Sequence, residues 1–444
     1  MSLYHSSLYQ WAAPVDSFWE SSAPLFEGGT SVSDDGICDV AVIGGGYTGL
    51  STAYHLARES NADVRVLDAG QIAWGASGRN GGFCSLHPSS LSFVDLIRSY
   101  GLHEAKRYVA SQVDAVNLIR TLLENEKIDA DLQGEGVFEV AHNQHQFTQL
   151  EEEAHLLSNI FDIPTKILCQ ETFAKEVYQS TEQFGAMWMG VGFGLHPMKF
   201  ARGLAEAAVR QGAKLHPQSR VIEWRSEKGQ HVLTTKNGTI RAKQVVMATN
   251  GFTPDNIHSS FSGQLLPVMS NIFTTRPLTD DELSAQNWRT DSPCSNTRNL
   301  LFYYRVLPDK RVLFGARGDL SGDPLSSQKM FQWLKKRFGE VFPGWQGVEI
   351  THFWRGLVCM TRNLTPAIGA LEDDPTVFYG LGYHGNGVAA APWAGRELAQ
   401  LIAGKKTMSD LPAPLQGPLA QMPFPALRRW YLRAALAYYR MKDL

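Results

Sequence analysis

Three glycines near the amino terminus have the spacing that suits the binding of a diphosphate. In the stretch DVAVIGGGYTGL, Gly44, Gly46 and Gly49 form a G-x-G-x-x-G pattern. The first glycine permits a tight turn, the second lets a pyrophosphate approach the main chain, and the third lets a following helix lie close to the strand. The N–H groups and partial positive charge at a helix N-terminus also attract an anion. The pattern therefore predicts a dinucleotide-binding turn.

The flanking residues predict the strand and the helix that such a turn requires. Val40, Val42 and Ile43 are typical of a buried parallel strand, and apolar residues then recur at helical spacing over 50–57. A second apolar run, 64–67, ends at Asp68. This carboxylate lies about 20 residues beyond the glycines, where a ribose-binding acid is expected. The alternative is a glycine-rich turn in an α/β unit without a ligand.

A second glycine-rich stretch follows Asp68. In AWGASGRNGG, residues 73–82, four of the ten residues are glycine. Such a composition predicts another loop whose backbone comes close to a ligand. A nicotinamide-dependent enzyme has no evident need for this second loop, so the stretch favours a different dinucleotide.

Residues 39–82 resemble the amino-terminal signature of the D-amino-acid-oxidase-type FAD oxidoreductases. Within that superfamily, IGGGYTGLS together with WGASGRNGG closely resembles the γ-glutamylputrescine oxidase branch. The resemblance implies that FAD is the cofactor, that Gly44–Gly49 hold its pyrophosphate, and that Asp68, where many relatives carry Glu, holds the adenosine ribose. It also implies that the second loop lines the flavin through Ala76, Ser77, Arg79, Asn80, Gly81 and Gly82.

Segments farther along the chain resemble the same family over 192–215, 220–253, 354–369 and 380–404. They imply additional cofactor contacts from Val221, Thr249, Cys359, Gly385, Gly387 and Val388. The resemblance also places a final helix under the flavin, where its N-terminus would stabilise negative charge on the reduced ring. Cys359 stands in a stretch similar to the one through which monomeric sarcosine oxidases attach FAD covalently. We expect non-covalent FAD, with a covalent link at Cys359 as the alternative.

These features predict an α/β fold with a Rossmann-type FAD-binding domain interleaved with an α+β substrate domain built on an antiparallel sheet. We expect the FAD-binding domain to comprise residues 36–100, 192–262 and 350–410. The substrate domain would comprise 101–191 and 263–349. Residues 411–444 would form a C-terminal segment with a basic amphipathic helix. That helix could pack on the protein or rest on an anionic membrane surface.

Two segments hold the candidate catalytic residues. The segment 302–317 predicts a hairpin, and family relatives have a similar Tyr-Tyr-Arg stretch on a strand facing the flavin. Because successive strand side chains point to opposite faces, at most one tyrosine can face the site. We select Tyr304, together with Arg305, whose guanidinium suits a carboxylate; packing within the sheet is the alternative. In the turn before the final helix, His384 and Asn386 are candidates, although the family pattern S-G-H-G has its histidine at the position of Asn386. A structural role for His384 is the alternative.

Composition argues against several other functions. A net charge of −3 over 444 residues gives no reason to expect a nucleic-acid partner. The five cysteines are odd in number and lack metal-ligand spacing, so we expect neither a disulfide scaffold nor a metal site. Neither a signal peptide nor a membrane-spanning run stands out. The expected location is cytoplasmic, with membrane contact through the C-terminal helix as an alternative.

The resemblance implies an oxidase that takes a hydride from the carbon beside an amine nitrogen and passes it to FAD. The imine product would hydrolyse, and oxygen would reoxidise the flavin to give hydrogen peroxide. The expected substrate is either γ-glutamylputrescine-like or a free L-amino acid. Two alternatives remain open: a dehydrogenase that passes electrons to a membrane quinone, and a flavoprotein that modifies a partner protein.

Overall fold

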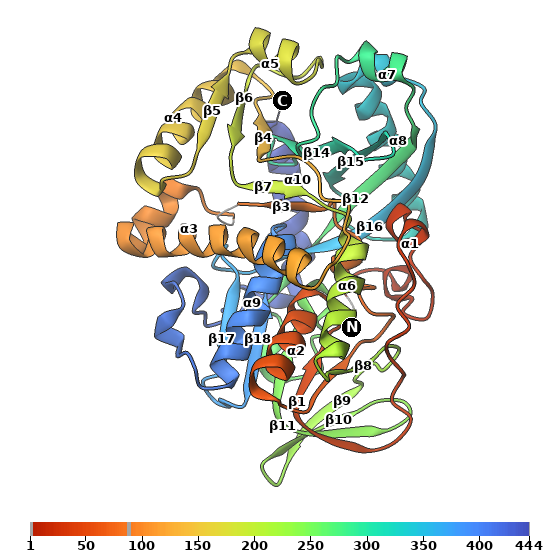
Figure 1. Cartoon of the computed structure of the whole chain (residues 1–444), viewed down its shortest axis with the longest axis vertical. Helices are drawn as coiled ribbons and strands as arrows, with labels where there is room; N and C mark the ends of the chain where they lie inside the picture. The colour runs from red at the N-terminus through yellow and green to blue at the C-terminus, as the bar shows by residue number, and fades with distance from the viewer. Residues whose placement is uncertain (1–2, 87–89, 444) are drawn as a thin grey trace.

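The computed structural model describes residues 3–86 and 90–443 and contains two large sheets, one in each half of the molecule (Figure 1). The first sheet lies in the lower half of the view and the second in the upper half. Helix α3 (Phe93–Asn125) crosses the molecule between them. The predicted fold class, a Rossmann-type domain joined to a second α+β domain, is confirmed.

The first sheet has the strand order β17-β18-β11-β1-β2-β8, with the β9–β10 hairpin attached to β11. Strands β1, β2, β8, β11 and β18 run parallel, as expected for short apolar strands that are buried on both faces. Their bounds are β1 Gly36–Ile43, β2 Val64–Leu67, β8 Lys214–His216, β9 Glu223–Glu227, β10 Gln230–Thr234, β11 Thr239–Met247, β17 Ala367–Ala370 and β18 Val377–Leu381.

Three helices cover one face of this sheet: α2 (Tyr47–Ser60), α6 (Pro197–Arg210) and α9 (Gly387–Ile402) (Figure 1). Alanines buried on α2 and α9 allow the two helices to pack closely. Helix α6 begins with proline at its first turn, and the His196 ring accepts the Lys199 N–H at 3.2 Å as its N-cap. The helices thus bring the turn after β1 and the turn before α9 to the same edge of the sheet.

The second sheet has the order β16-β12-β15-β14-β13-β4-β6-β5. Neighbouring strands are antiparallel except β13 and β4, which pair in parallel. Its bounds are β4 Val137–Val140, β5 Thr165–Leu168, β6 Ala186–Met189, β12 Leu266–Pro277, β13 Cys294–Asn296, β14 Phe302–Val306, β15 Arg311–Arg317 and β16 Ile350–Met360. The predicted boundary assigned residues 350–360 to the FAD-binding domain, whereas β16 is hydrogen-bonded along its length to β12, whose long edge it completes.

Each face of the second sheet packs against a different core. On the outer face, an aromatic cluster that includes Phe314 and Phe338 packs under α8 (Pro324–Val341). On the inner face, residues such as Ile272 and Leu313 join the core that also contains the helices of the first domain. The remaining elements are α1 Phe18–Ser22, α4 Gln144–Phe161, α5 Gln170–Glu176, α7 Asp280–Ala285, β3 Phe83–Ser85 and β7 Gly192–Gly194.

The C-terminal helix α10 (Arg428–Lys442) packs one face on the protein and leaves another exposed. Leu432 and Leu436 are buried against the start of the chain and β12. Arg428 is buried as well, where it pairs with Asp255 and donates to the Leu265 carbonyl at 2.8 Å. The outer face exposes aromatic and apolar side chains, among them Trp430, Tyr438 and Met441. In the described part of the chain, no helix is long and apolar enough to cross a membrane.

Candidate active site

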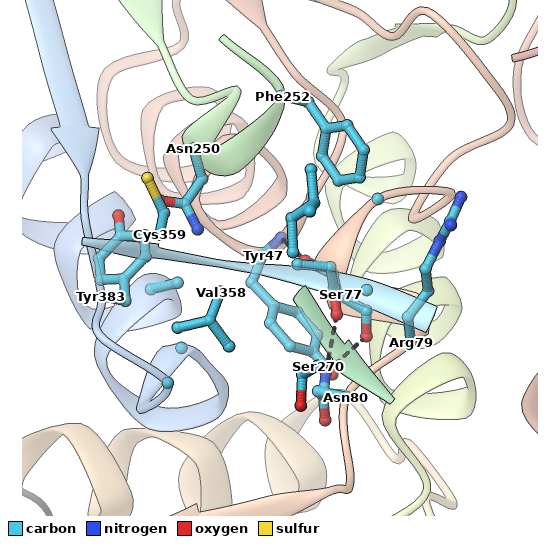
Figure 2. Close-up of a pocket in the computed structure, with 18 of the residues that line it drawn as sticks. Tyr47, Ser77, Arg79, Asn80, Asn250, Phe252, Ser270, Val358, Cys359 and Tyr383 are labelled. Carbon is cyan, nitrogen blue, oxygen red and sulfur yellow. Dashed lines mark hydrogen bonds between the residues drawn. The ribbon is translucent and has the colours of Figure 1, made fainter. Parts of the chain in front are cut away.

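A cavity of about 400 Å³ lies between the carboxyl ends of the parallel strands of the first sheet and the inner face of the second sheet. Its wall is built from the turn after β1, the loop after β2, the end of β16 and the turn before α9, together with the inner face of the second sheet. In Figure 2, Asn250, Cys359 and Tyr383 lie on one side of the view, and Ser77, Arg79 and Asn80 lie on the other. The cavity thus brings together all the segments in which cofactor contacts were predicted.

The glycine turn after β1 has the close contacts that its spacing predicts. Gly44 has a φ of +113°, and a Cβ at this position would lie 2.7 Å from the Ala248 carbonyl oxygen. A Cβ at Gly49 would lie 2.0 Å from the Gly44 carbonyl oxygen, so only glycine lets α2 start directly against β1. Gly44 and Gly46 line the cavity, while Gly49 lies behind the turn, outside the lining.

Asp68 lies at the end of β2 with its carboxylate held against the glycine turn. Its two oxygens accept the backbone N–H groups of Gly45 at 2.7 Å and Gly70 at 2.8 Å. Burial raises the pKa of this carboxyl, and these two hydrogen bonds oppose the rise. Asp68 lines the cavity together with Val221 and Thr249, which are also predicted to contact the cofactor.

The loop after β2 is fixed to the start of α2 by side-chain hydrogen bonds. The Ser77 hydroxyl accepts the Tyr47 N–H at 2.9 Å, and the Asn80 amide donates to the Ala76 and Ser77 carbonyls at 3.2 and 2.9 Å. Ala76, Ser77, Arg79, Asn80 and Gly81 all line the cavity. Gly82 lies outside the lining, where its N–H donates to the Asn80 side-chain oxygen at 2.8 Å.

Arg79 brings a buried positive charge to the cavity wall. Its guanidinium lies 3.9 Å from the ring centre of Trp74 and donates to the carbonyls of Trp74 at 2.8 Å and Arg355 at 3.2 Å. Burial lowers the pKa of the guanidinium to about 9, which leaves it protonated at neutral pH. Among the described residues, the buried Nη2 has no hydrogen-bond partner. An unsatisfied buried donor next to a cavity fits an anionic or carbonyl group of a bound cofactor.

His384, in the turn before α9, is held through both ring nitrogens by residues outside that turn. The backbone N–H of Thr361 donates to Nε2 at 3.3 Å, so Nε2 is the acceptor and the proton belongs on Nδ1, which lies 2.9 Å from the Ser90 hydroxyl. This arrangement favours the structural alternative for the histidine, although it lines the cavity. Asn386, also in the lining, donates to the Gln112 side-chain oxygen at 3.3 Å. Gly385, Gly387 and Val388, which are predicted to contact the cofactor, also line the cavity.

Cys359 lies near the end of β16 and lines the cavity with a buried side chain. Its carbonyl oxygen accepts the His384 N–H at 3.0 Å, which joins β16 to the turn before α9. Burial raises the pKa of the thiol well above its usual value. Because a thiolate is the reactive form of cysteine, this environment supports the expectation of a non-covalent cofactor.

The structure corrects the choice between the two tyrosines of β14. They point to opposite faces, as predicted, but Tyr303 lines the cavity and Tyr304 lies in the outer core. Tyr304 hydrogen-bonds the hydroxyl of Tyr178 at 2.6 Å and stacks on Phe314. The Tyr303 hydroxyl lies 2.7 Å from the Ser270 hydroxyl, and burial raises its pKa to about 12.

Arg305 lies on the same face as Tyr303 but outside the cavity lining, where it braces the backbone behind the site. Its guanidinium donates to the carbonyls of Gly81 at 3.2 Å and Leu195 at 2.5 Å and to the Gln133 side chain at 3.1 Å. The predicted carboxylate-binding role therefore does not suit its position, since protein oxygens already occupy its donors.

Arg317, at the end of β15, lines the cavity, whereas Arg305 does not. It donates to the His384 carbonyl at 3.2 Å and, in the described part of the chain, pairs with no carboxylate. The alternation of side chains along β15 could have indicated Arg317. It lies on the same face as Gly315, which pairs with Tyr303 across the hairpin. The sequence analysis also missed Ser270, Ile272, Ser295 and Glu139, which the second sheet contributes to the lining.

The residues around the first-domain end of the cavity fit FAD. The glycine turn leaves no room for side chains, the N-terminus of α2 faces the cavity, and Arg79 presents an unsatisfied donor. The fold and this site define a flavin-dependent oxidoreductase. The family model described as FAD dependent oxidoreductase matches residues 39–401, and the chain belongs to this family.

The relatives agree with this assignment. Gamma-glutamylputrescine oxidoreductase of Escherichia coli is 32% identical over 436 residues, covering 97% of this chain and 98% of the relative. Glycine oxidase of Bacillus subtilis is 24% identical over 377 residues, covering 84% and 95%. The crystal structure of glycine oxidase from Geobacillus kaustophilus has a TM-score of 0.73 at 22% identity, covering 87% of this chain and 99% of that structure. The protein is an FAD-dependent oxidoreductase of the type that oxidatively deaminates amines or amino acids.

Proposed function

We propose that this protein oxidises the C–N bond of an extended primary amine of the γ-glutamylputrescine type. The main support for the proposal is the length of the cavity, which extends across the inner face of the second sheet. Its lining includes Ile272 of β12, Tyr303 of β14, Ser295 of β13 and Glu139 of β4. With β15 between β12 and β14, four strand spacings of about 4.8 Å give a span of about 19 Å. A free amino acid would occupy only part of that length.

Residues of the chain position the substrate, limit the access of water and hold the cofactor-binding turn in place. When bound, FAD would supply the acceptor for a hydride from the carbon beside the reacting nitrogen. Tyr303 stays protonated at neutral pH because its pKa is about 12, so its hydroxyl can position a substrate polar group next to Ser270. The buried side chain of Ile272 beside them limits access of water. The fixed His384 ring holds the turn before α9 in place for the cofactor.

Oxygen is the proposed electron acceptor, with hydrogen peroxide as the product. The support is the similarity to two glycine oxidases. The exposed aromatic face of α10, flanked by the exposed Arg429 and Arg433, favours a membrane quinone as the second candidate. Peroxide formation in air supports oxygen. Reduction of a soluble quinone by the substrate-reduced enzyme without peroxide in air would instead support the quinone.

The test is peroxide production, coupled to a peroxidase dye, across a substrate panel. The panel holds γ-glutamylputrescine, putrescine, sarcosine, glycine, and the L- and several D-amino acids. A signal confined to γ-glutamylputrescine supports the proposal. A broad signal across L-amino acids with none from γ-glutamylputrescine would overturn it.

A free L-amino acid is the second candidate substrate, and Arg317 is the observation that favours it. A guanidinium that lines the cavity without a carboxylate partner suits the α-carboxylate of an amino acid. In that case Arg317→Ala should raise KM for L-amino acids by about 10- to 100-fold. An unchanged KM would remove the support that Arg317 lends to this candidate.

A further inference from the structure

Glu139 lies at the end of the cavity that is formed by the second sheet. It pairs with Ser295 across β4 and β13, and Ser295 pairs with Tyr303 across β13 and β14. Paired residues on neighbouring strands point to the same face of a sheet, so all three side chains face the cavity that they line. Two strand spacings separate Glu139 from Tyr303 by about 10 Å.

Two neighbouring carboxyl groups, neither with a basic partner among the described residues, lie at this end of the cavity. In the part of the chain that the structure describes, the Glu139 carboxylate forms no ion pair and no hydrogen bond, and its charged neighbour is Glu153 of α4. The basic residue in the same part of the lining, Arg298, is paired with Glu182 at 2.9 Å. Burial, together with the neighbouring Glu153, raises the pKa of Glu139 well above its usual value, so the carboxyl holds a proton until a cation binds. A cationic ligand would relieve this arrangement, because it favours the ionised carboxylate.

We propose that Glu139 determines substrate specificity by binding a second ammonium group of the substrate, with Glu153 as a second carboxyl group close by. The inference rests on the proposed function and deepens it, since it names the group that the far end of the cavity recognises. The group recognised by Glu139 is an ammonium that lies about 10 Å from the part of the substrate next to Tyr303. It could belong to the α-amino group of a γ-glutamyl substrate or to the second amine of a long aliphatic diamine.

The experiment compares matched substrates on matched variants of the FAD-loaded protein. Glutarylputrescine differs from γ-glutamylputrescine only by the missing α-ammonium, and octylamine differs from 1,8-diaminooctane by the missing second amine. The variants are Glu139→Gln, which preserves shape, and Glu152→Gln as a control on the exposed side of α4. We expect Glu139→Gln to raise KM about 10- to 100-fold for a substrate with the distal ammonium, with kcat within about twofold. The same variant should leave KM unchanged for the matched substrate that lacks the distal ammonium.

The substrate pair that responds identifies the source of the ammonium. An equal effect on both members of each pair, or no effect on either, would overturn the inference. Glu152→Gln should match the unmodified protein throughout.

A binding measurement separates failure of this inference from failure of the proposed function. N-butyl-γ-glutamine has the distal groups of γ-glutamylputrescine but lacks its terminal primary amine, so its affinity can be read from the change in the flavin absorption spectrum. We expect Glu139→Gln to weaken this binding about 10- to 100-fold. If γ-glutamylputrescine is not oxidised but this loss is seen, the proposed reaction fails and the ammonium site stands. Equal affinity in both proteins, or no binding to the unmodified protein, would overturn the site.

Discussion

Replacing Arg305 by alanine separates a bracing role from a substrate-binding role. In the structure, Arg305 donates to the Gly81 and Leu195 carbonyls and to the Gln133 side chain. Gly81 lines the cavity in the loop predicted to contact the flavin. The substitution should therefore destabilise the protein and loosen FAD, rather than act on one class of substrate.

The expected loss in the free energy of unfolding can be worked out from the hydrogen-bond acceptors that Arg305 leaves without a donor. Three oxygens lose a donor at about 1–3 kcal/mol each, and the vacated volume adds a cavity penalty. Removal of a buried cation offsets part of the loss, since burial lowers the pKa of the Arg305 guanidinium to about 9. A decrease of about 3–6 kcal/mol in the free energy of unfolding results, which is a large share of the stability of a typical protein.

The assay combines the midpoint of urea unfolding with the FAD content after gel filtration. The matched control is Arg317→Ala, because Arg317 makes a single 3.2 Å hydrogen bond to the His384 carbonyl and lines the cavity. This control should keep its fold and its FAD. If Arg305→Ala instead remained stable and yellow, with KM raised only for substrates that carry a carboxylate, Arg305 would face the substrate and our account would be refuted.

Three other substitutions test the cofactor site and the acid stability. Gly44→Ala should abolish FAD retention, because its Cβ would meet the Ala248 backbone at 2.7 Å; absorbance of the purified protein near 450 nm checks this, and a yellow variant would contradict the phosphate-binding turn. Acid precipitation should release all FAD from both the unmodified protein and Cys359→Ser, since burial keeps the thiol protonated; flavin left only in the unmodified pellet would show a covalent link. Burial lowers the pKa of His196 to about 3, so its contribution is complete above pH about 6.5 and is lost as the pH falls toward 3. His196→Asn, which keeps a helix cap, should therefore lose less stability on acidification over this range, and parallel acid unfolding curves would contradict this.

The cofactor end of the site could be predicted because its chemistry depends on local spacing. The glycines after β1, Asp68 and the loop over Ala76–Gly81 all lie within one βαβ unit and the loop that follows it, so their positions depend little on the rest of the chain. The turn before α9 could be predicted from its family pattern for the same reason.

The residues at the substrate end of the site could not be predicted in the same way. Which of them reach the cavity depends on which face of a strand meets the other domain, and pairing between distant segments decides that. Alternation shows that Tyr303 and Tyr304 point apart, but only the packing of α8 on the outer face shows that Tyr304 points away. Glu139 reaches the cavity because β4 pairs with β13, more than a hundred residues later in the sequence. Likewise, β16 follows the long edge of β12 rather than the predicted domain boundary.

The order of strands in the first sheet has a consequence for synthesis of the protein on the ribosome. Strand β1 emerges before its neighbour β11, which spans Thr239–Met247, and before the next strand, β18, which spans Val377–Leu381. The turn at His384–Val388, which closes the cavity, follows later still. The nascent chain must therefore hold β1 without its neighbour β11 until the residues of that strand have also been synthesised. FAD can be enclosed only after the His384–Val388 turn has been synthesised, so a protein truncated before this turn would lack a closed cofactor site.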